Sequence, residues 1–177
     1  MELLVAGEDV DPALLAEVST LGHPPRVVGV FRAREVPGTA DVAVALWHVS
    51  DPGNVGTLIR SADAFGAGVM LSEGCADPFG PKALRAGMGS TFRVPLSGFE
   101  LRNAVALVAE GGEPLDALEL ERYATFVVGA EREGLPEEVL ARCDARATIP
   151  VHNVDSLNVA IAGTIALYAR SCSKART

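Results

Sequence analysis

Two runs of sequence decide the fold class of this chain: Gly129-Ala-Glu131-Arg-Glu-Gly134-Leu-Pro136 and Ile149-Pro150-Val-His-Asn-Val-Asp155-Ser156-Leu157-Asn158-Val159-Ala160. Each run follows an apolar stretch typical of a buried strand and precedes a stretch typical of a helix. Such loops lie at the carboxyl ends of parallel strands, where a ligand binds. Glycine lets the backbone approach a ligand closely, and the carboxylate, hydroxyl and amide side chains supply acceptors and donors. We therefore expect a ligand site at this edge of a parallel sheet.

A third run lies upstream, Asp51-Pro-Gly-Asn54-Val-Gly-Thr-Leu-Ile-Arg60, directly after the apolar residues 42–49. Its first three residues predict a turn, and Asn54 is a natural helix N-cap. The apolar residues that follow have helical spacing and leave Arg60 on the face away from the core. Arg60 has two interpretations, a site residue or an i,i+3 partner of Asp63, and the run taken alone favours the ion pair.

Elements of both kinds alternate along the chain, which is typical of an α/β fold with a parallel sheet and helices on both faces. Strands are predicted near residues 42–49, 69–71, 92–94, 114–115, 126–129 and 146–149. Helices are predicted near 54–65, 81–88, 100–110, 136–142 and 157–172. The last helix is apolar on nearly every side, and its small residues permit close packing against the sheet and a second subunit.

Four motifs in this order resemble the SpoU or TrmH branch of the SPOUT RNA methyltransferases, over roughly residues 41 to 172. The family's first motif is similar to Asn54–Arg60. Its second is similar to the Gly-x-Glu-x-x-Gly of residues 129–134, and its third to Ser156–Val159 after Ile149-Pro150. The stretch Pro81–Pro95 resembles the segment between the first two motifs.

The resemblance implies a domain over residues 41–177 with a C-terminal trefoil knot that binds S-adenosyl-L-methionine. It also implies transfer of a methyl group to a ribose 2′-hydroxyl of ribosomal or transfer RNA by a homodimer, in which Arg60 of one subunit lies near the cofactor of the other. The cofactor-binding residues that it implies are Gly129, Ala130, Glu131, Gly134, Ile149, Val151, Ser156, Leu157 and Asn158. The catalytic residues that it implies are Arg60, Asn54, Glu131, Ser156 and Asn158.

Two of these roles have physical competitors. Arginine is effectively always protonated, so we expect Arg60 to grip phosphate and stabilise alkoxide charge rather than act as a base. Ser156 and Asn158 could instead cap the final helix. The presence of both neighbouring motifs favours the site role for these two residues.

The chain departs from the family's pattern at three places. Asp51 stands where asparagine is usual, and Gly87 where serine is common. The loop between Val151 and Ser156 is one residue shorter than usual, and His152-Asn153 replaces its glycine. These departures concern the substrate preference more than the reaction.

Charge and composition bound the function. A formal net charge of −8 argues against indiscriminate nucleic-acid binding, so RNA contact needs a local basic patch, for which the candidates are Arg60, Lys82, Arg85 and Arg93. Hydrophobic residues make up 49% of the chain and aromatic ones 5%, which predicts an aliphatic core. The three cysteines favour a reduced cytoplasm, and the scattered histidines give no reason to expect a metal. No apolar run reaches transmembrane length, so we expect no membrane partner.

Residues 1–38 form a predicted appendage, with a helix near 11–20, a strand over Arg26–Phe31 and a linker over Glu35–Thr39. The segment resembles the tail of the small ribosomal-protein-like RNA-binding domain that many family members carry. Because so short a segment buries little core, we expect it to dock on the catalytic domain or to be the remnant of a longer chain.

Two other function classes stay open. One is a catalytically idle RNA-binding or ribosome-associated module of the same fold. The other is a small nucleotide binder outside the family, against which the chain has neither a Gly-x-x-x-x-Gly-Lys-Ser/Thr run nor a Gly-x-Gly-x-x-Gly run after a strand.

Overall fold

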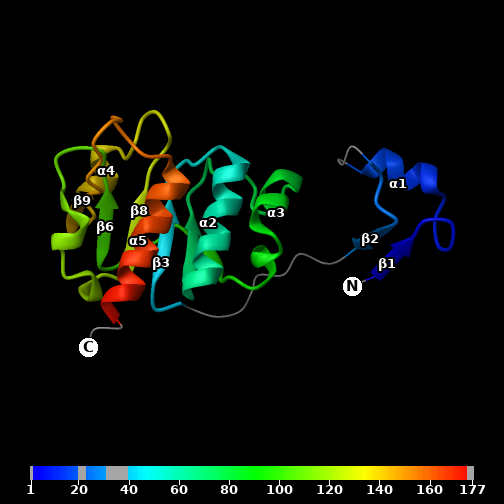
Figure 1. Cartoon of the computed structure of the whole chain (residues 1–177), viewed down its shortest axis with the longest axis horizontal. Helices are drawn as coiled ribbons and strands as arrows, with labels where there is room; N and C mark the ends of the chain where they lie inside the picture. Colours follow the sequence, from blue (N-terminus) through cyan, green and yellow to red (C-terminus); the bar gives the residue numbers. More distant parts are fainter. Residues whose placement is uncertain (1, 20–22, 31–39, 175–177) are drawn as a thin grey trace. The chain divides into compact units, whose positions relative to one another are not determined.

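The computed structural model describes residues 2–19, 23–30 and 40–174. The chain forms two compact units, Met1–Arg34 and Glu35–Thr177 (Figure 1). The predicted linker over Glu35–Thr39 and the end of the predicted strand at Phe31 lie outside the described residues.

The first unit is small and contains both strands and a helix. Strand β1 (Glu2–Val5) pairs antiparallel with β2 (Val27–Val30), and α1 (Pro12–Val18) lies between them in the sequence. Asp11 caps α1, since its carboxylate accepts from the amide of Ala13. The predicted helix and the strand over Val27–Val30 are confirmed, whereas β1 was not predicted.

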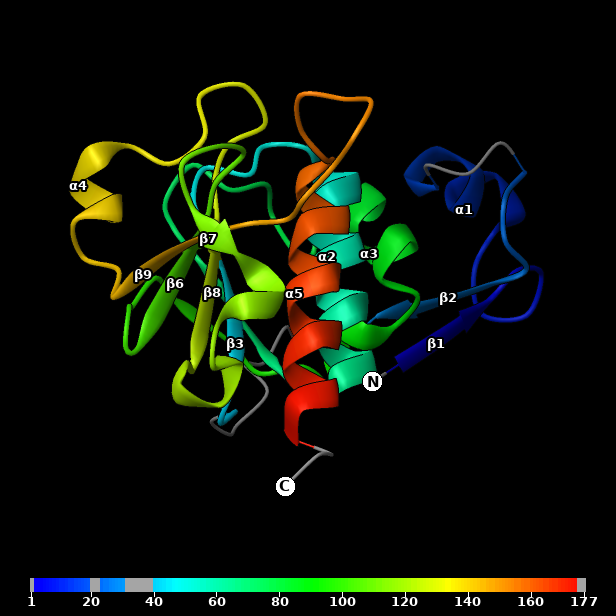
Figure 2. The ribbon, with the colours of Figure 1, turned by 60° about the vertical axis from the view of Figure 1, so that its left-hand side comes forward.

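The second unit is built on a seven-stranded sheet in the order β5-β4-β3-β8-β6-β9-β7, and every pair of neighbours is parallel. Its strands are β3 (Ala43–Leu46), β4 (Gly68–Leu71), β5 (Leu96–Gly98), β6 (Ala104–Leu107), β7 (Glu113–Pro114), β8 (Thr125–Val128) and β9 (Ala145–Thr148). The predicted parallel sheet is confirmed. All loops that follow these strands therefore leave from one edge of the sheet, at the top of the domain in Figure 2.

Helices cover both faces of the sheet, as the sequence predicts. They are α2 (Pro52–Phe65), α3 (Pro81–Gly87), α4 (Glu137–Leu140) and α5 (Val159–Lys174), with short 3-10 turns at Ser90–Phe92, Leu115–Ala117 and Leu120–Arg122. Figure 2 shows α2 and α5 side by side on one face and α4 on the other. The hydroxyls of Ser61 and Thr164 join α2 to α5 at 2.7 Å.

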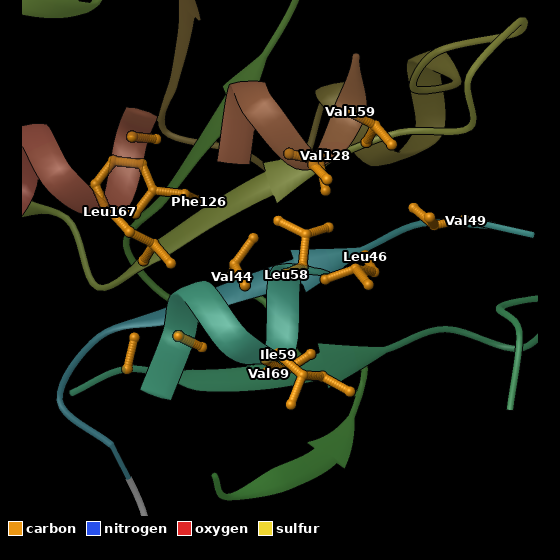
Figure 3. Close-up of a cluster of buried hydrophobic side chains, with 14 of the residues drawn as sticks. Val44, Leu46, Val49, Leu58, Ile59, Val69, Phe126, Val128, Val159 and Leu167 are labelled. Carbon is orange, nitrogen blue, oxygen red and sulfur yellow. The ribbon is translucent and has the colours of Figure 1, made fainter. Parts of the chain in front are cut away.

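The core is aliphatic and two-sided because side chains alternate along each strand. Val44 and Leu46 of β3, with Phe126 of β8, pack against α2 and α5 (Figure 3). Ala45 and Val127, one position out of phase, pack on the other face with residues that include Val139 of α4. Burial of both faces explains why these strands are continuous apolar runs.

Glycine in α5 confirms the expected close packing against the sheet side of the domain. A Cβ at Gly163 would lie 2.5 Å from Cδ2 of Leu58 and 3.4 Å from Cγ2 of Val44. A larger residue at position 163 would therefore displace the Leu58 side chain or α5.

Two predicted elements are wrong. The helix predicted near 100–110 is the buried strand β6, because a short run that is apolar throughout has no period to separate strand from helix. The strand predicted near 92–94 begins later, at Leu96, because Ser90–Phe92 forms a 3-10 turn. The strand predicted at 114–115 is shifted by one residue, as β7 ends at Pro114.

The trefoil knot implied by the resemblance stays a prediction. None of the helices in the described ranges has both the length and the apolar character that crossing a bilayer requires. The same ranges contain no group of three or more His, Cys, Asp or Glu side chains arranged to hold a metal ion.

Candidate active site

A cavity of about 400 Å³ opens at the carboxyl edge of the sheet, beyond β6, β8 and β9. The loop after β8 and the loop after β9 form much of its wall. All nine residues predicted to bind the cofactor line it: Gly129, Ala130, Glu131, Gly134, Ile149, Val151, Ser156, Leu157 and Asn158. The second and third motifs therefore share one site.

Three predicted catalytic residues form a hydrogen-bonded relay at the cavity. The Asn158 Nδ2 donates to Oδ1 of Asn54 at 3.1 Å, and Nδ2 of Asn54 donates to Oε1 of Glu131 at 2.8 Å. These residues come from the start of α5, the first turn of α2 and the loop after β8. The relay joins all three motifs, although its members lie 77 and 104 residues apart in the sequence.

Asn158 caps the final helix and also takes part in the relay. Its Oδ1 accepts from the amides of Ala160 at 2.9 Å and Ile161 at 3.3 Å, so it caps α5. Because this oxygen faces the helix, the amide nitrogen faces Asn54. The cap therefore fixes the direction of the relay.

The predicted N-cap of α2 is wrong. Asp51, not Asn54, caps this helix, with Oδ1 accepting from the Asn54 amide at 2.9 Å. Pro52 occupies the first helical turn, where proline is favoured. The helix therefore begins earlier than the sequence analysis predicted. Asn54 thus lies inside the helix, which frees its side chain for Glu131.

The loop from Gly129 to Gly134 is a tight turn that glycine makes possible. The Gly134 amide donates to the carbonyl of Ala130 at 2.9 Å, and Gly134 has a φ of 66°. A Cβ at Gly129 would lie 2.3 Å from the backbone of Gly134. The turn presents Glu131 and Arg132 to the cavity.

Arg60 lies apart from this cluster. It is exposed on α2, about 9 Å along the helix axis beyond Asn54, and does not line the cavity. Within the described ranges, the side chain of Arg60 makes no hydrogen bond or ion pair. The alternative Arg60–Asp63 pair is wrong, because Asp63 is held elsewhere.

Asp63 is bound by Arg93 and Ser90. The Arg93 guanidinium donates to Oδ2 at 3.0 Å from Nε and 2.5 Å from Nη2, and the Ser90 hydroxyl donates at 2.7 Å. These donors, Arg93 foremost, lower the pKa of Asp63 below its usual value. Arg93, a predicted RNA contact, is thus an anchor between the segment after α3 and α2.

The other predicted contact residues lie on the surface. Lys82 and Arg85 are exposed on α3, on the same helix face. Ser156 is exposed and lines the cavity without capping α5, since Asn158 does that. The alternative capping role is therefore wrong for Ser156.

Sequence reasoning missed one wall of the cavity. Leu107, Val108 and Ala109 line it from the end of β6, together with Val128 and Ala162. The signal was the apolar run before Gly111-Gly112, which was assigned to a helix. Asp155, inside the second quoted run, was also missed as a lining residue.

Comparison with known proteins shows to which family the chain is related. The model of the SpoU rRNA Methylase family matches residues 41–168. An uncharacterized tRNA/rRNA methyltransferase of Synechocystis sp. is 32% identical over 183 residues, covering 93% of this chain and 65% of that protein. The 23S rRNA (guanosine(2553)-2′-O)-methyltransferase RlmP of Bacillus subtilis is 36% identical over 143 residues, covering 73% of this chain and 58% of that protein.

Solved structures agree. The AdoMet-bound rRNA methyltransferase from Sinorhizobium meliloti superposes with a TM-score of 0.80 at 33% identity, covering 89% of this chain and 68% of that one. The chain spans between half and two thirds of the length of the curated relatives that it matches.

Proposed function

The chain belongs to the SpoU rRNA Methylase family, and we propose that it is an S-adenosyl-L-methionine-dependent methyltransferase acting on a ribose 2′-hydroxyl of ribosomal or transfer RNA. The observation that carries the proposal is that the second and third motifs line one cavity and that Asn54 of the first motif is hydrogen-bonded to both of them. The names of the relatives, which include a 2′-O-methyltransferase of 23S rRNA, support the same reaction.

The cavity fits S-adenosyl-L-methionine in size and in charge. Its volume of about 400 Å³ is within the usual range for small-molecule sites, and Leu107, Val128 and Ile149 give it an apolar wall. Among the described residues that line it, the charged ones are two carboxylates, Glu131 and Asp155, and one guanidinium, Arg132. The cofactor carries the complementary set, a sulfonium and an ammonium with one carboxylate.

The protein's own part in the reaction is to orient and to stabilise charge. When bound, the cofactor supplies an electrophilic methyl group on sulfur. The relay of Asn158, Asn54 and Glu131 holds the cavity wall in a fixed geometry, which aligns the reacting groups. Arg60 grips an RNA phosphate and stabilises the negative charge that develops on the 2′-oxygen.

We propose that the enzyme works as a homodimer, because Arg60 lies outside the cavity of its own subunit. The exposed face of α5 carries Ile161 and Tyr168, which are 51% and 58% exposed and seven residues apart on one side of the helix. Pairing through this face would bury them and would bring α2, next to α5, toward the partner. Light scattering tests this: a monomer at micromolar concentration would contradict it.

The proposed RNA surface comprises Arg60, Lys82 and Arg85, which concentrate positive charge on a chain with a net charge of −8. Residues 1–38 are proposed to contribute to RNA selection, and deleting them tests this: unchanged selectivity would exclude the contribution. With these substrates and this cofactor, the enzyme is proposed to act in the cytoplasm.

The reaction is tested by mapping 2′-O-methyl sites in RNA from cells with and without the gene. Arg60→Ala should abolish transfer while leaving cofactor affinity, measured by calorimetry, within about twofold, because Arg60 makes no contact that folding needs. Arg142→Ala, at an exposed arginine outside the cavity lining, is the matched control and should keep full turnover. Saturable cofactor binding without transfer to any RNA would instead indicate a catalytically idle module.

The assignment of the cavity charges has its own test. Arg132→Met should weaken binding of S-adenosyl-L-methionine about tenfold and leave 5′-methylthioadenosine unaffected, since that analogue lacks the carboxylate. Equal losses for both ligands would show that Arg132 does not contact the carboxylate.

A further inference from the structure

The side of α2 that carries Arg60 borders α3 and the turn that follows it (Figure 2). Gly56 lies one turn before Arg60 on this side, and Asp63 lies about one turn after it. A Cβ at Gly56 would lie 2.3 Å from the carbonyl oxygen of Ala83, so α3 contacts the α2 backbone directly. Further along α2, the Ser90 hydroxyl donates to Asp63 at 2.7 Å. Arg60 therefore lies between two fixed contacts, although its own side chain is exposed.

Asp63 is the carboxylate that α2 places next to Arg60. Residues three apart on a helix have Cβ atoms about 5–6 Å apart, which is within reach of an ion pair. In the structure, however, Oδ2 of Asp63 accepts from Nε and Nη2 of Arg93 at 3.0 and 2.5 Å, and also from Ser90. These donors, Arg93 foremost, lower the pKa of Asp63, so its carboxylate is charged at pH 7. The negative charge next to Arg60 is thus present but already balanced.

The backbone after α3 directs Ser90 and Arg93 toward α2. Met88 and Gly89 both have a positive φ, 49° and 85°, which is uncommon at Met88 because it is not glycine. These two residues end α3 and lead directly into the 3-10 turn that begins at Ser90. Ser90 is 3% exposed, so its hydroxyl has little access to water. The donors to Asp63 are therefore in place before any RNA binds.

Direct contact with RNA is the simplest alternative role for Arg93. Its guanidinium is already bound to the Asp63 carboxylate, and the pair has no net charge with which to attract a phosphate. A contact between Arg93 and RNA would have to break this ion pair. The effect of Arg93 on RNA is therefore indirect.

We propose that Arg93 is a positioning residue, which holds Asp63 and so keeps the guanidinium of Arg60 available to an RNA phosphate. The inference rests on the proposed function, in which Arg60 grips that phosphate. Without Arg93, Asp63 competes in two ways, because it pairs with Arg60 along the helix and its charge repels the phosphate. The ion pair changes an equilibrium about twofold, and repulsion between unit charges about 7 Å apart in water changes it about threefold. Together they lower RNA affinity about fivefold.

The test compares Arg93→Met with the double variant Arg93→Met/Asp63→Asn. Arg93→Met leaves the carboxylate unbalanced, so methyl transfer to total RNA from cells lacking the gene should be about fivefold slower at limiting RNA. The double variant also lacks the carboxylate and should be within twofold of the unsubstituted protein. Arg93→Lys keeps the positive charge and should also be within twofold. A salt concentration of about 10 mM keeps electrostatic screening weak.

Recovery in the double variant separates this role from the alternatives. If Arg93 contacted RNA, or if its ion pair merely held α3 in place, the double variant would be as slow as Arg93→Met, and this result would overturn the proposal. Asp63→Asn alone keeps an acceptor for Arg93 and Ser90, so it should transfer methyl groups at least as fast as the unsubstituted protein. Cofactor affinity, measured by calorimetry, should agree within twofold among all variants and show that each is folded, since none of these residues lines the cavity.

The two proposals fail separately. RNA affinity, measured by filter binding with the same RNA, should follow the pattern of the transfer rates. Transfer by the unsubstituted protein with an unchanged rate in Arg93→Met would refute the positioning role and keep the enzyme. An RNA affinity that falls in Arg93→Met and recovers in the double variant, without transfer by any of the proteins, would keep the positioning role and refute the enzyme.

Discussion

The relay at the cavity makes a sharp prediction for Asn54→Asp. In the structure, Nδ2 of Asn54 donates to Oε1 of Glu131 at 2.8 Å, and Oδ1 accepts from Asn158 at 3.1 Å. Aspartate keeps the acceptor but replaces the donor with a second carboxylate oxygen. Two carboxylates then face each other at hydrogen-bonding distance.

The expected loss of stability in Asn54→Asp follows from the lost hydrogen bond to Glu131 and the new repulsion between carboxylates. Like charges about 4 Å apart repel by about 1 kcal/mol in water and about 4 kcal/mol at an effective dielectric constant of 20. Glu131 is exposed, so the lower part of that range applies, and the lost hydrogen bond adds about 1 kcal/mol. A stronger acceptor for Asn158 offsets part of this cost. We expect unfolding at pH 7 to require about 1–3 kcal/mol less free energy, which shifts the urea midpoint by about 1 M.

The pH dependence separates repulsion from simple loss of contacts. Repulsion raises the pKa of the carboxyl pair, and once one carboxyl is protonated it donates to the other. The destabilisation should therefore be present at pH 7 and shrink as the pH falls to about 4. Asn54→Ala is the matched control, because it loses both hydrogen bonds without adding charge and its cost should not vary over this range. Urea unfolding of both variants that shows Asn54→Asp as stable as Asn54→Ala at pH 7 would refute the relay.

Three further predictions concern other parts of the domain. Gly129→Ala should lower cofactor affinity at least tenfold by calorimetry, because its Cβ would lie 2.3 Å from the backbone of Gly134; an unchanged affinity would show that the loop yields. Asp63→Asn should be destabilising at pH 7: Arg93 lowers the pKa of folded Asp63, so the stabilisation exists above the unfolded pKa of about 4 and disappears as the pH falls through the folded value. A gap between the two unfolding curves that stays constant down to pH 2 would contradict this. Burial raises the pKa of Cys143 to about 11, so about one thiol in a thousand is ionised at pH 8. Iodoacetamide should therefore label Cys143 at least tenfold more slowly in the folded than in the unfolded protein. Equal labelling rates by mass spectrometry would exclude the raised pKa.

The motifs predicted the cavity well because each marks a transition from a parallel strand to a helix. Gly129 and Gly134 permit a tight turn that other residues would not, and this constraint is visible in the sequence. The parallel sheet then brings distant loops to one edge. Every residue predicted to bind the cofactor consequently lines the same cavity.

The cavity wall at the end of β6 was not predicted, because the sequence there carries no such constraint. Residues 104–107 lie in the sheet between β8 and β9, buried on both faces, and a strand in that position carries no alternation of polar and apolar residues. Predicting a helix there hid the end of β6, and with it Leu107 and Val108 as cavity residues. The apolar character was predicted correctly, but the sequence of this run has no periodicity that distinguishes a strand from a helix.

The relay shows a different limit of local patterns. A local interpretation makes Asn54 a helix cap and gives Asn158 a choice between a cap and a site residue. Only the folded chain brings these two residues to Glu131, and only the cap at Asp51 frees Asn54 to reach it.

The double role of Asn158 decides how variants at this site should be interpreted. Its oxygen caps α5 and its nitrogen orients Asn54, so folding of the last helix and geometry of the cavity depend on one side chain. Replacing Asn158 by alanine removes a cap worth about 1 kcal/mol together with the relay, and any loss of activity would combine the two effects. Asn54 caps nothing, since Asp51 does, so a substitution there alters the relay alone. The contribution of the relay to catalysis is therefore measured at Asn54, and the difference between the two alanine variants measures what the cap adds.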